Sequence, residues 1–229
     1  MISVILPTLN EKKNIFLIYK KLLKLKIISE IIFVDDNSTD KTFFEIKKIK
    51  NKKVVGYLRK AKKRDLSKSI ILGIEKSKNK IILVMDCDLQ HDVNYIPKMY
   101  KNYVKFNCDV VVASRFLKKK ILGNLGYFRS LISRLAICMI SIFFGKRSSD
   151  PLSGFFMCKK ELINRNKHLF FGQGYKILFD ILFNCNENLK IVDQNIVFRR
   201  RNFEKSKFNS RIIWLFLRQM IYTLLLVKK

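Results

Sequence analysis

The stretch IILVMDCDLQHD, residues 81–92, decides the fold that we expect for this chain. Its first residues form a continuous apolar run, which is typical of a strand buried on both faces of a parallel sheet. Carboxylates follow at once, at Asp86, Asp88 and Asp92. Clustered carboxylates repel one another unless a cation or hydrogen-bond donors neutralise them. The stretch therefore predicts a buried strand whose carboxyl end carries a charged site.

Further apolar runs predict strands of the same kind at residues 3–6, 31–34, 54–58 and 110–113. Segments with helical periodicity separate them, at about residues 14–25, 41–49, 66–76 and 95–104. Repeated β-α units of this length indicate an α/β, Rossmann-like sheet that is mostly parallel, with helices on both faces. A long apolar helix at 129–144 and a Gly/Ser/Pro turn at 148–154 follow. We expect this second half to complete the sheet.

The composition points to a polyanionic partner. The chain has 229 residues and a formal net charge of +29, while its 48% hydrophobic content excludes a disordered chain. Many arginines of the second half alternate with large apolar side chains, which suits a lipid headgroup region better than a duplex. No recognisable RNA-binding module is present, so we expect no nucleic-acid partner. The five widely spaced cysteines include no CxxC pair and fit a reducing cytosol.

The last apolar segment, residues 212–227, is interrupted by Arg218 and Gln219. It falls short of the roughly 20 apolar residues that a membrane-spanning helix needs. We favour an amphipathic helix at a membrane surface over one packed entirely in the core. The N-terminal ISVILP is short and lacks a preceding basic region, so it predicts a strand and no signal peptide. These features predict peripheral attachment to the cytoplasmic face of a membrane.

Polar side chains follow several of the predicted strands where each strand ends, at residues 7–11, 35–38 and 86–92. Open α/β sheets bind ligands at the carboxyl ends of their strands. Mg²⁺ or Mn²⁺ takes oxygen ligands from one or two carboxylates and completes its shell with phosphates. Neither GxGxxG nor GxxxxGK[ST] occurs in the chain, so a metal bound to Asp-x-Asp is the expected means of holding a diphosphate. The alternative is that these residues only cap strands and form turns.

Several segments resemble, in chain order, the family 2 glycosyltransferases, and among them the polyprenol- or dolichol-phosphate mannosyltransferases: SVILPTLNE, VDDNSTD, VMDCDLQHD, VVASRF, SDPLSGFF, GYKI and FRRR followed by SK. The resemblance covers residues 2 to about 209. It implies a GT-A fold over residues 1–209, with 210–229 as a membrane-associating helix. It also implies metal-dependent, inverting transfer of a hexose, expected to be mannose from GDP-mannose, to a polyprenyl or dolichyl phosphate.

The resemblance also assigns residues. The donor nucleotide sugar would contact Pro7, Leu9, Glu11, Val34, Asp36, Asp86, Cys87, Asp88, Arg201 and Lys207. The ion, Mg²⁺ or Mn²⁺, would be held by Asp86, Asp88 and Gln90. The acceptor would contact Arg115, Arg129, Ser133 and Asp150. Catalysis would rest on Asp88, Arg115, Arg129, Ser133 and Arg201. Independently of the family, Arg129 and Ser133 are spaced to share one helix face, and arginine offers a fork for phosphate.

Departures from the family pattern bear on donor affinity rather than on reaction type. Leu9 stands where an aromatic residue is usual, which predicts weaker base stacking. Asp65 and Glu204 place carboxylates where glycine is typical. These residues leave open the alternative that the chain is a non-catalytic, membrane-associated protein that binds nucleotide sugars. Within the enzyme class, the donor could instead be UDP-glucose or another UDP-sugar, and the acceptor a glycan or glycolipid hydroxyl.

A phosphate acceptor would simplify the chemistry. A phosphate monoester is already largely dianionic at neutral pH, so its oxygen can attack the anomeric carbon without a strong general base. The protein would position the reactants and stabilise the leaving nucleoside diphosphate, with Arg201 and Lys207 closing over it. A small membrane-protein subunit is a further expected partner.

Overall fold

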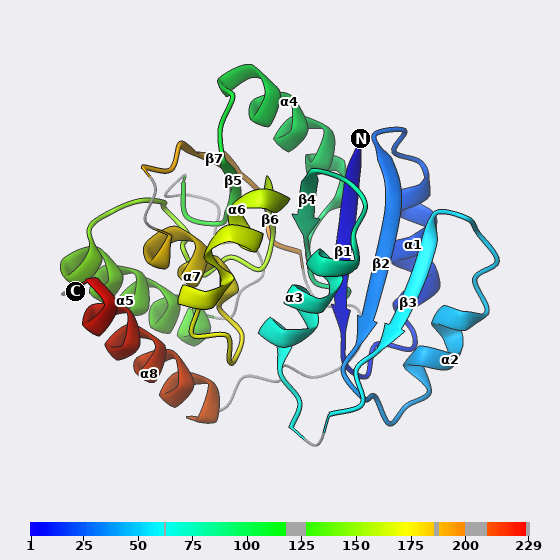
Figure 1. The fold of residues 1–229 in the computed structure, drawn as a ribbon, viewed down its shortest axis with the longest axis horizontal. Helices are drawn as coiled ribbons and strands as arrows, with labels where there is room; N and C mark the ends of the chain where they lie inside the picture. The colour runs from blue at the N-terminus through cyan, green and yellow to red at the C-terminus, as the bar shows by residue number, and fades with distance from the viewer. Residues whose placement is uncertain (62, 118–126, 186–187, 200–209, 228–229) are drawn as a thin grey trace.

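The computed structural model describes residues 1–61, 63–117, 127–185, 188–199 and 210–227. A single seven-stranded sheet runs through it in the order β3-β2-β1-β4-β6-β5-β7 (Figure 1). The strands are β1 (Ile2–Thr8), β2 (Ile28–Asp35), β3 (Val54–Leu58), β4 (Ile81–Val84), β5 (Val110–Ser114), β6 (Phe156–Lys159) and β7 (Ile191–Asn195). All neighbouring strands pair in parallel except β6, which runs antiparallel to β4 and β5. The predicted α/β, mostly parallel sheet is confirmed.

Helices cover both faces of this sheet. They are α1 (Ile15–Leu23), α2 (Thr42–Lys47), α3 (Leu66–Lys76), α4 (Ile96–Phe106), α5 (Tyr127–Phe144), α6 (Lys160–Asn166), α7 (Ile177–Asn184) and α8 (Ser210–Val227). Short 3₁₀ turns lie at η1 (Val93–Tyr95) and η2 (Lys167–Leu169). The predicted ranges of β3 and α3 agree with the structure at both ends, and the other predicted elements shift by a few residues.

The two faces of the sheet are separated by the alternation of side chains along each strand. In β1, Val4 and Leu6 point into the core beneath α1, α2 and α4. Ile5, between them, points into the second core, beneath α3 and α5 to α8. Because the strand is buried on both sides, its middle from Val4 to Leu6 is apolar on both faces, and its buried polar residues Ser3 and Thr8 are hydrogen-bonded.

Close packing of α3 against β1 depends on Gly73. A Cβ atom at this position would lie 2.5 Å from Cγ2 of Ile5 and 3.1 Å from Cγ2 of Val34. The helix can therefore approach the sheet only because residue 73 has no side chain. This approach also sets the position of the N-terminus of α3, which reaches the carboxyl edge of the sheet.

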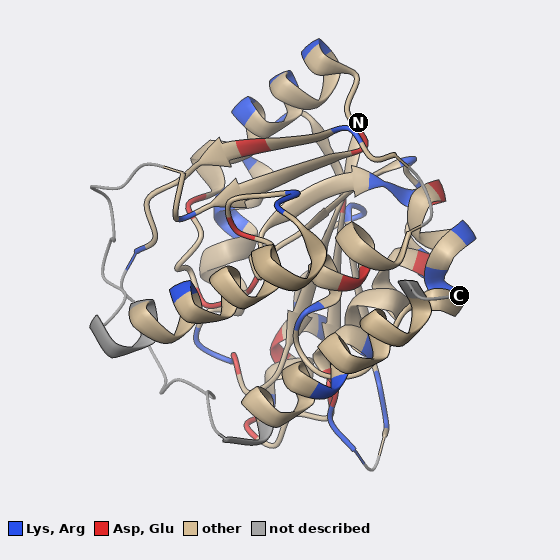
Figure 2. Ribbon diagram, turned by 90° about the vertical axis from the view of Figure 1, so that its left-hand side faces the viewer, with Lys and Arg blue, Asp and Glu red and all other residues tan. Residues whose placement is uncertain are grey.

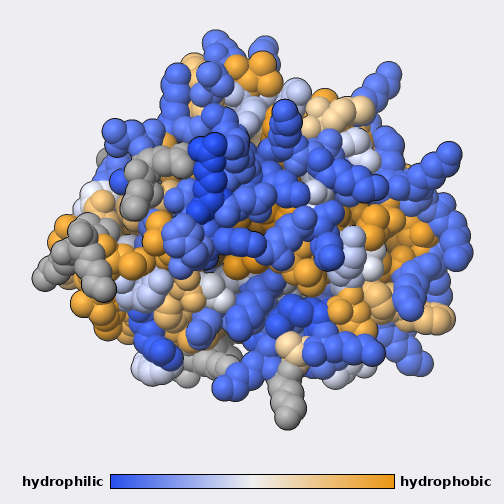
Figure 3. Space-filling view, viewed as in Figure 1, coloured by the Kyte–Doolittle hydropathy of each residue, from blue (hydrophilic) through white to orange (hydrophobic). Residues whose placement is uncertain are grey.

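The molecular surface combines basic charge with one apolar region. Lysines and arginines lie on helices and loops on several sides of the molecule (Figure 2). Helices α5 and α8 lie against each other at the left of Figure 1, where hydrophobic side chains reach the surface (Figure 3). The most exposed of these are Leu135, Ile142, Phe143, Trp214, Ile221 and Leu225. Among the described residues, no helix is both long and apolar enough to cross a bilayer.

Helix α8 is amphipathic within the fold. Gln219, Met220 and Thr223 are buried against the domain, while Trp214 and Leu225 are exposed. Gln219 Nε2 donates a hydrogen bond to the carbonyl of Lys176 at 3.1 Å. The helix therefore has a buried face docked on the sheet domain and an apolar exposed face.

We expect Gly73→Ala to lower the free energy of unfolding by about 1–3 kcal/mol, because the added methyl overpacks the contact with Ile5. Denaturant unfolding followed by circular dichroism measures the change. The matched control is Lys76→Ala on the exposed side of the same helix, which should stay within about 0.5 kcal/mol of wild type. Equal stability of the Gly73→Ala protein and wild type would contradict the close-packing argument.

Candidate active site

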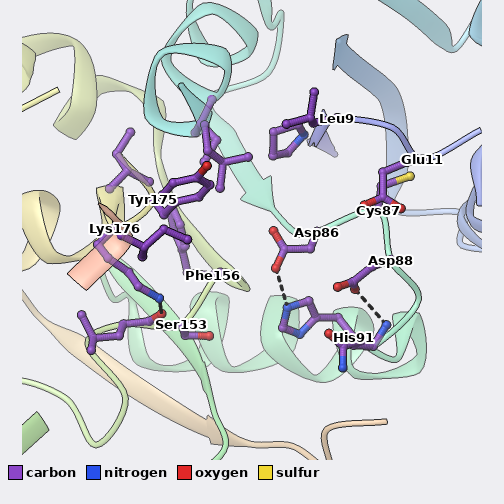
Figure 4. Close-up of a pocket in the computed structure, with 18 of the residues that line it drawn as sticks. Leu9, Glu11, Asp86, Cys87, Asp88, His91, Ser153, Phe156, Tyr175 and Lys176 are labelled. Atoms are coloured by element: carbon purple, nitrogen blue, oxygen red, sulfur yellow. Dashed lines mark hydrogen bonds and ion pairs between the residues drawn. The ribbon is translucent and has the colours of Figure 1, made fainter. Parts of the chain in front are cut away.

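One pocket opens at the carboxyl edge of the sheet, where β1, β2, β4 and β5 end (Figure 4). The predicted site residues that line it are Pro7, Leu9, Glu11, Asp36, Asp86, Cys87, Asp88, Gln90 and Arg115. They come from loops that are far apart in the chain but leave the same edge of a parallel sheet. The carboxylates of Asp36, Asp86 and Asp88 therefore face a common pocket.

Other predicted residues lie elsewhere. Val34 is fully buried in the core beneath α3, and neither Asp150 nor Ser133 lines the pocket. Arg201 and Lys207 lie outside the described residues, as does Glu204. The backbone of Arg129 belongs to the first turns of α5, but its side chain is also outside the described part. The roles predicted for all of these residues stay predictions.

The loop after β4 turns sharply at Leu89, which has a left-handed φ of 62°. The amide of Gln90 donates to Oδ1 of Asp88 at 3.1 Å, and Nε2 of His91 lies 3.4 Å from Oδ2 of Asp86. The buried ring of His91 packs against Phe155 and Phe198. The loop thus fixes two carboxylates and an amide side chain at the pocket.

Space beside Asp86 is provided by Gly154. A Cβ atom on this glycine would lie 2.8 Å from Oδ2 of Asp86. Gly154 precedes β6, and because β6 is antiparallel its start lies at the same edge as the ends of its neighbours. The turn at 148–154 therefore forms a wall of the pocket.

The donor set fits a hard divalent cation. Asp86, Asp88 and Gln90 offer carboxylate and amide oxygens, which suit Mg²⁺ or Mn²⁺. In the part of the chain that the structure describes, no three His, Cys, Asp or Glu side chains are grouped closely enough to hold an ion by themselves. Such a site matches an ion that shares its shell with ligand phosphates rather than one caged by protein.

The two carboxylates after β2 have different environments. Asp35 is turned into the loop and accepts hydrogen bonds from the Ser38 amide at 3.0 Å and from the Thr8 hydroxyl at 3.2 Å. Asp36 lines the pocket and forms an ion pair with Arg59. Burial raises the pKa of Asp36, and the hydrogen bond from the Asp65 amide and the charge of Arg59 offset only part of this rise. Asp35 thus shapes the loop that presents Asp36.

Asp150 contacts Arg115. Oδ2 of Asp150 accepts from Nε of Arg115 at 2.7 Å, and Oδ1 accepts from Nη2 at 2.9 Å. Burial lowers the pKa of the Arg115 guanidinium, but the charge and hydrogen bonds of Asp150 more than offset this, and the net shift is upward. The adjoining Ser148 and Ser149 donate hydrogen bonds to the carboxylate of Asp193 on β7. The pair therefore holds Arg115 charged and fixed at the pocket.

Residues that the sequence reasoning missed form the opposite wall. Tyr175 and Lys176 face Asp86 across the pocket, and Nζ of Lys176 donates to the carbonyl of Leu152 at 3.1 Å (Figure 4). The remaining wall residues not predicted are Leu66, Ile70, His91, Leu152, Ser153, Gly154, Phe156, Ile177, Phe198 and Ile212. The GYKI motif was the available signal, but no local pattern distinguishes a pocket lysine from the many surface lysines of this chain.

The buried carboxyl group of Asp180 in α7 binds the segment that leads into the wall with Tyr175 and Lys176. Its oxygens accept from Asn184 Nδ2 at 3.0 Å and from the Gly172 amide at 3.4 Å. Burial raises the pKa of Asp180 to about 6, although hydrogen bonds from the Gln219 side chain and from the Phe171 and Gly172 amides act in the opposite direction. A titrating carboxyl group is therefore bound to the backbone of the segment that precedes this wall.

Comparison of the sequence with known proteins gives one family and named relatives. A sequence model of glycosyl transferase family 2 matches residues 3–170. A dolichol-phosphate mannosyltransferase of Pyrococcus furiosus is 32% identical over 98% of this chain. The chain spans 63% of the length of that relative. A dolichol-phosphate mannosyltransferase of Saccharomyces cerevisiae is 28% identical over 95% of this chain and 85% of its own length.

Solved structures support the fold. Glucosyl-3-phosphoglycerate synthase of Mycobacterium tuberculosis, in complex with phosphoglyceric acid, superposes with a TM-score of 0.72 at 20% sequence identity. The superposition covers 98% of this chain and 79% of that one. The same enzyme in complex with Mn²⁺, UDP-glucose and phosphoglyceric acid gives a TM-score of 0.73 at 20% identity, over 98% and 78% of the two chains. The predicted GT-A architecture is thereby confirmed.

We expect Asp180→Asn to change how stability depends on pH. The pKa of Asp180 is raised above its ordinary value of 3.8, so the folded state binds its proton more tightly and the wild type loses stability as pH rises from about 4 to about 6. The variant lacks this loss, so the difference in unfolding free energy between the two proteins should shift by roughly 2–3 kcal/mol over that window in favour of the variant. Denaturant unfolding at a series of pH values measures it, and a constant difference would contradict the assignment.

Proposed function

Because the chain belongs to glycosyl transferase family 2, and is therefore a glycosyltransferase, we propose that it transfers mannose from GDP-mannose to a polyprenyl or dolichyl phosphate. The observation that carries this proposal is the convergence of Asp36, Asp86 and Asp88 on one pocket at the carboxyl edge of the sheet. The names of the archaeal and yeast relatives support the choice of substrates. Since the chain spans 63% of the archaeal relative, the activity of that longer protein is part of the proposal.

In this proposal the donor lies across the carboxyl ends of the strands. Mg²⁺ or Mn²⁺ would be held by Asp86, Asp88 and Gln90, and when bound it would supply positive charge against the diphosphate. The donor would contact Pro7, Leu9, Glu11, Asp36, Cys87, Arg201 and Lys207, while Val34, buried in the core, would only support this wall from behind. We add Lys176, because its chain crosses the pocket wall opposite Asp86 and can bring a cation toward the diphosphate or the transferred sugar.

The acceptor phosphate would enter from the side of α5 and α8. Ile212 of α8 lines the pocket, so the apolar surface of the helices continues to the pocket mouth. Arg115, held by Asp150, would contact the phosphate, and Arg129 and Ser133 of α5 would bind it further out. The dianionic phosphate oxygen attacks the anomeric carbon in line with the departing diphosphate, which inverts that centre. The chain's task is to hold the two reactants and exclude water.

Attachment to a membrane fits the same arrangement. Two helices that contact each other expose apolar side chains: α8 exposes Trp214, Ile221 and Leu225, and α5 exposes Ile142 and Phe143. Arg218 stacks on Trp214 at 4.8 Å, which places a cation beside an interfacial aromatic ring. We propose peripheral binding to the cytoplasmic face through this surface, with residues 210–229 as the main attachment segment. A small membrane protein could share it.

A UDP-sugar donor, such as UDP-glucose, is the second candidate. It is favoured by the structural neighbours, whose complexes contain UDP or UDP-glucose with Mn²⁺. Leu9, in place of an aromatic residue, removes one contact that the family resemblance implies for the base. The two donors differ in base size, so their binding can be separated directly.

The proposal is tested by incubating the protein with GDP-mannose or UDP-glucose, a short polyprenyl phosphate and Mg²⁺ or Mn²⁺, with products identified by mass spectrometry. We expect mannosyl phosphoryl polyprenol from GDP-mannose. Asp88→Asn should lower turnover by about 100-fold or more, because it removes a ligand charge while keeping an oxygen for the Gln90 amide. Chelation of the metal should have the same effect on wild type.

Asp92→Asn is the matched control, since Asp92 lies in the same loop but does not line the pocket. It should keep turnover within about threefold of wild type, as expected for a change outside the site. Undiminished turnover of Asp88→Asn without metal would exclude the metal assignment. If the protein transferred sugar from UDP-glucose and not from GDP-mannose, the donor would be a UDP-sugar instead of GDP-mannose.

Arg129→Ala should raise the KM for polyprenyl phosphate by about 10-fold or more and leave the KM for the donor near its wild-type value, because arginine provides a bidentate contact to phosphate. Initial rates at varied acceptor and fixed donor concentrations measure this. Lys105→Ala, on the exposed end of α4, serves as the charge-matched control. Collapsed donor binding with unchanged acceptor kinetics would reverse the role given to Arg129.

A further inference from the structure

The N-terminus of α3 forms hydrogen bonds with both the backbone N–H and the backbone C=O of Gly174. Oδ2 of Asp65 accepts a hydrogen bond from the Gly174 amide at 2.9 Å. The amide and hydroxyl of Ser67 donate to the Gly174 carbonyl at 3.0 and 3.2 Å. Gly174 is buried and has a left-handed φ of 89°, which suits glycine. We call this set of contacts the Gly174 clamp.

Asp65 has two separate tasks in this clamp. Its Oδ1 accepts from the amide of Lys68 at 3.2 Å and so caps α3, while its Oδ2 reaches the remote Gly174 amide. A glycine at this position, as the family resemblance implies, could make neither contact. Asp65 does not line the pocket itself, and its predicted bearing on donor affinity stays a prediction.

The clamp joins two walls of the pocket. On one side, the backbone amide of Asp65 donates to Oδ2 of Asp36 at 2.5 Å, and Asp36 lines the donor wall. On the other side, Gly174 is followed directly by Tyr175 and Lys176, which form the opposite wall. Lys176 is held further by its carbonyl, which accepts from Gln219 of α8. Hydrogen bonds and a short stretch of backbone therefore connect Asp36 to Lys176.

We propose that Asp65 is a positioning residue: by binding the backbone of Gly174, it fixes where the Lys176 side chain enters the pocket. The inference rests on the proposed function, in which the Lys176 ammonium faces phosphate or sugar oxygens. An ammonium group aids transfer only while its distance to those oxygens is held, and a long flexible side chain depends on its backbone anchor for this. Asp65 supplies the anchor from the donor side.

Asp65→Ser separates the two tasks. Serine is a good helix N-cap, but its single short hydroxyl cannot also reach the Gly174 amide. We expect kcat/KM to fall by about tenfold, because Lys176 loses its fixed place. In a Lys176→Met background the same substitution should change kcat/KM by less than about twofold, since the group that it positions is gone. Equal losses in both backgrounds, or no loss in either, would overturn the proposal.

Amide hydrogen exchange of residues 172–176, read by mass spectrometry, tests the clamp without any assay of activity. Asp65→Ser should lose protection there, and Asp65→Asn, which retains one acceptor oxygen, should lose less. Unchanged protection in Asp65→Ser would overturn the proposal on its own. If wild type transfers no sugar, the proposed function fails. The coupling of Asp65 to Lys176 is then measured from the Kd of GDP and of UDP for four proteins: wild type, Asp65→Ser, Lys176→Met and the double variant.

Asp109→Ser is the matched control. Asp109 also fastens a remote backbone amide, that of Lys190 at 2.9 Å, and binds Nζ of Lys159 at 2.6 Å. It lies before β5, at the edge of the sheet opposite the pocket. Its loss should reduce stability and leave kcat/KM within about twofold of wild type. If Asp109→Ser lowered kcat/KM as much as Asp65→Ser, the loss of any carboxylate–backbone hydrogen bond would lower activity. The specific role of Asp65 would then be refuted.

Discussion

Repulsion between carboxylates crowded at one edge of the sheet is the constraint on which the rest of the site depends. The fold answers it locally wherever it can. Asp35 is turned into its own loop by Ser38, Asp36 is paired with Arg59, and Asp150 is paired with Arg115. Asp86 and Asp88 also face the pocket, Asp86 beside His91 and Asp88 bound by the Gln90 amide. In the proposed reaction a divalent cation neutralises these carboxylates and also binds the donor diphosphate. The need for charge balance therefore favours a ligand that carries phosphates.

The geometry of the sheet explains why these groups meet. Parallel strands bring the loops after β1, β2, β4 and β5 to one edge, and the antiparallel β6 adds the loop before it. That loop carries Asp150, which fixes Arg115, and Gly154, whose missing side chain leaves room for Asp86. A parallel strand at the same place would have sent this loop to the opposite edge. The reversal of one short strand is therefore part of the site.

Sequence reasoning reached the parts of the fold and site that local patterns encode. Continuous apolar runs predicted β1 to β5, and the polar residues after them predicted one edge of the pocket. It did not locate β6 and β7, because β6 has four residues and β7 mixes Asp193, Gln194 and Asn195 with apolar ones. Nor did it find the wall with Tyr175 and Lys176. The contact that holds this wall joins residues 109 positions apart, and no local pattern carries such a contact.

The position of α8 links the site to the surface around it. One face of α8 packs on the domain through Met220 and Thr223, Gln219 binds the backbone of the pocket wall, and Ile212 reaches the pocket itself. Its opposite face exposes Trp214 and Leu225, and the neighbouring α5 also exposes apolar residues. A substrate with a charged head and a long apolar chain would meet both environments in one place. If α8 rests on a bilayer, its exposed face fixes the height of the pocket above the lipid, so that a lipid phosphate can reach Arg115 while its hydrocarbon chain stays in the membrane.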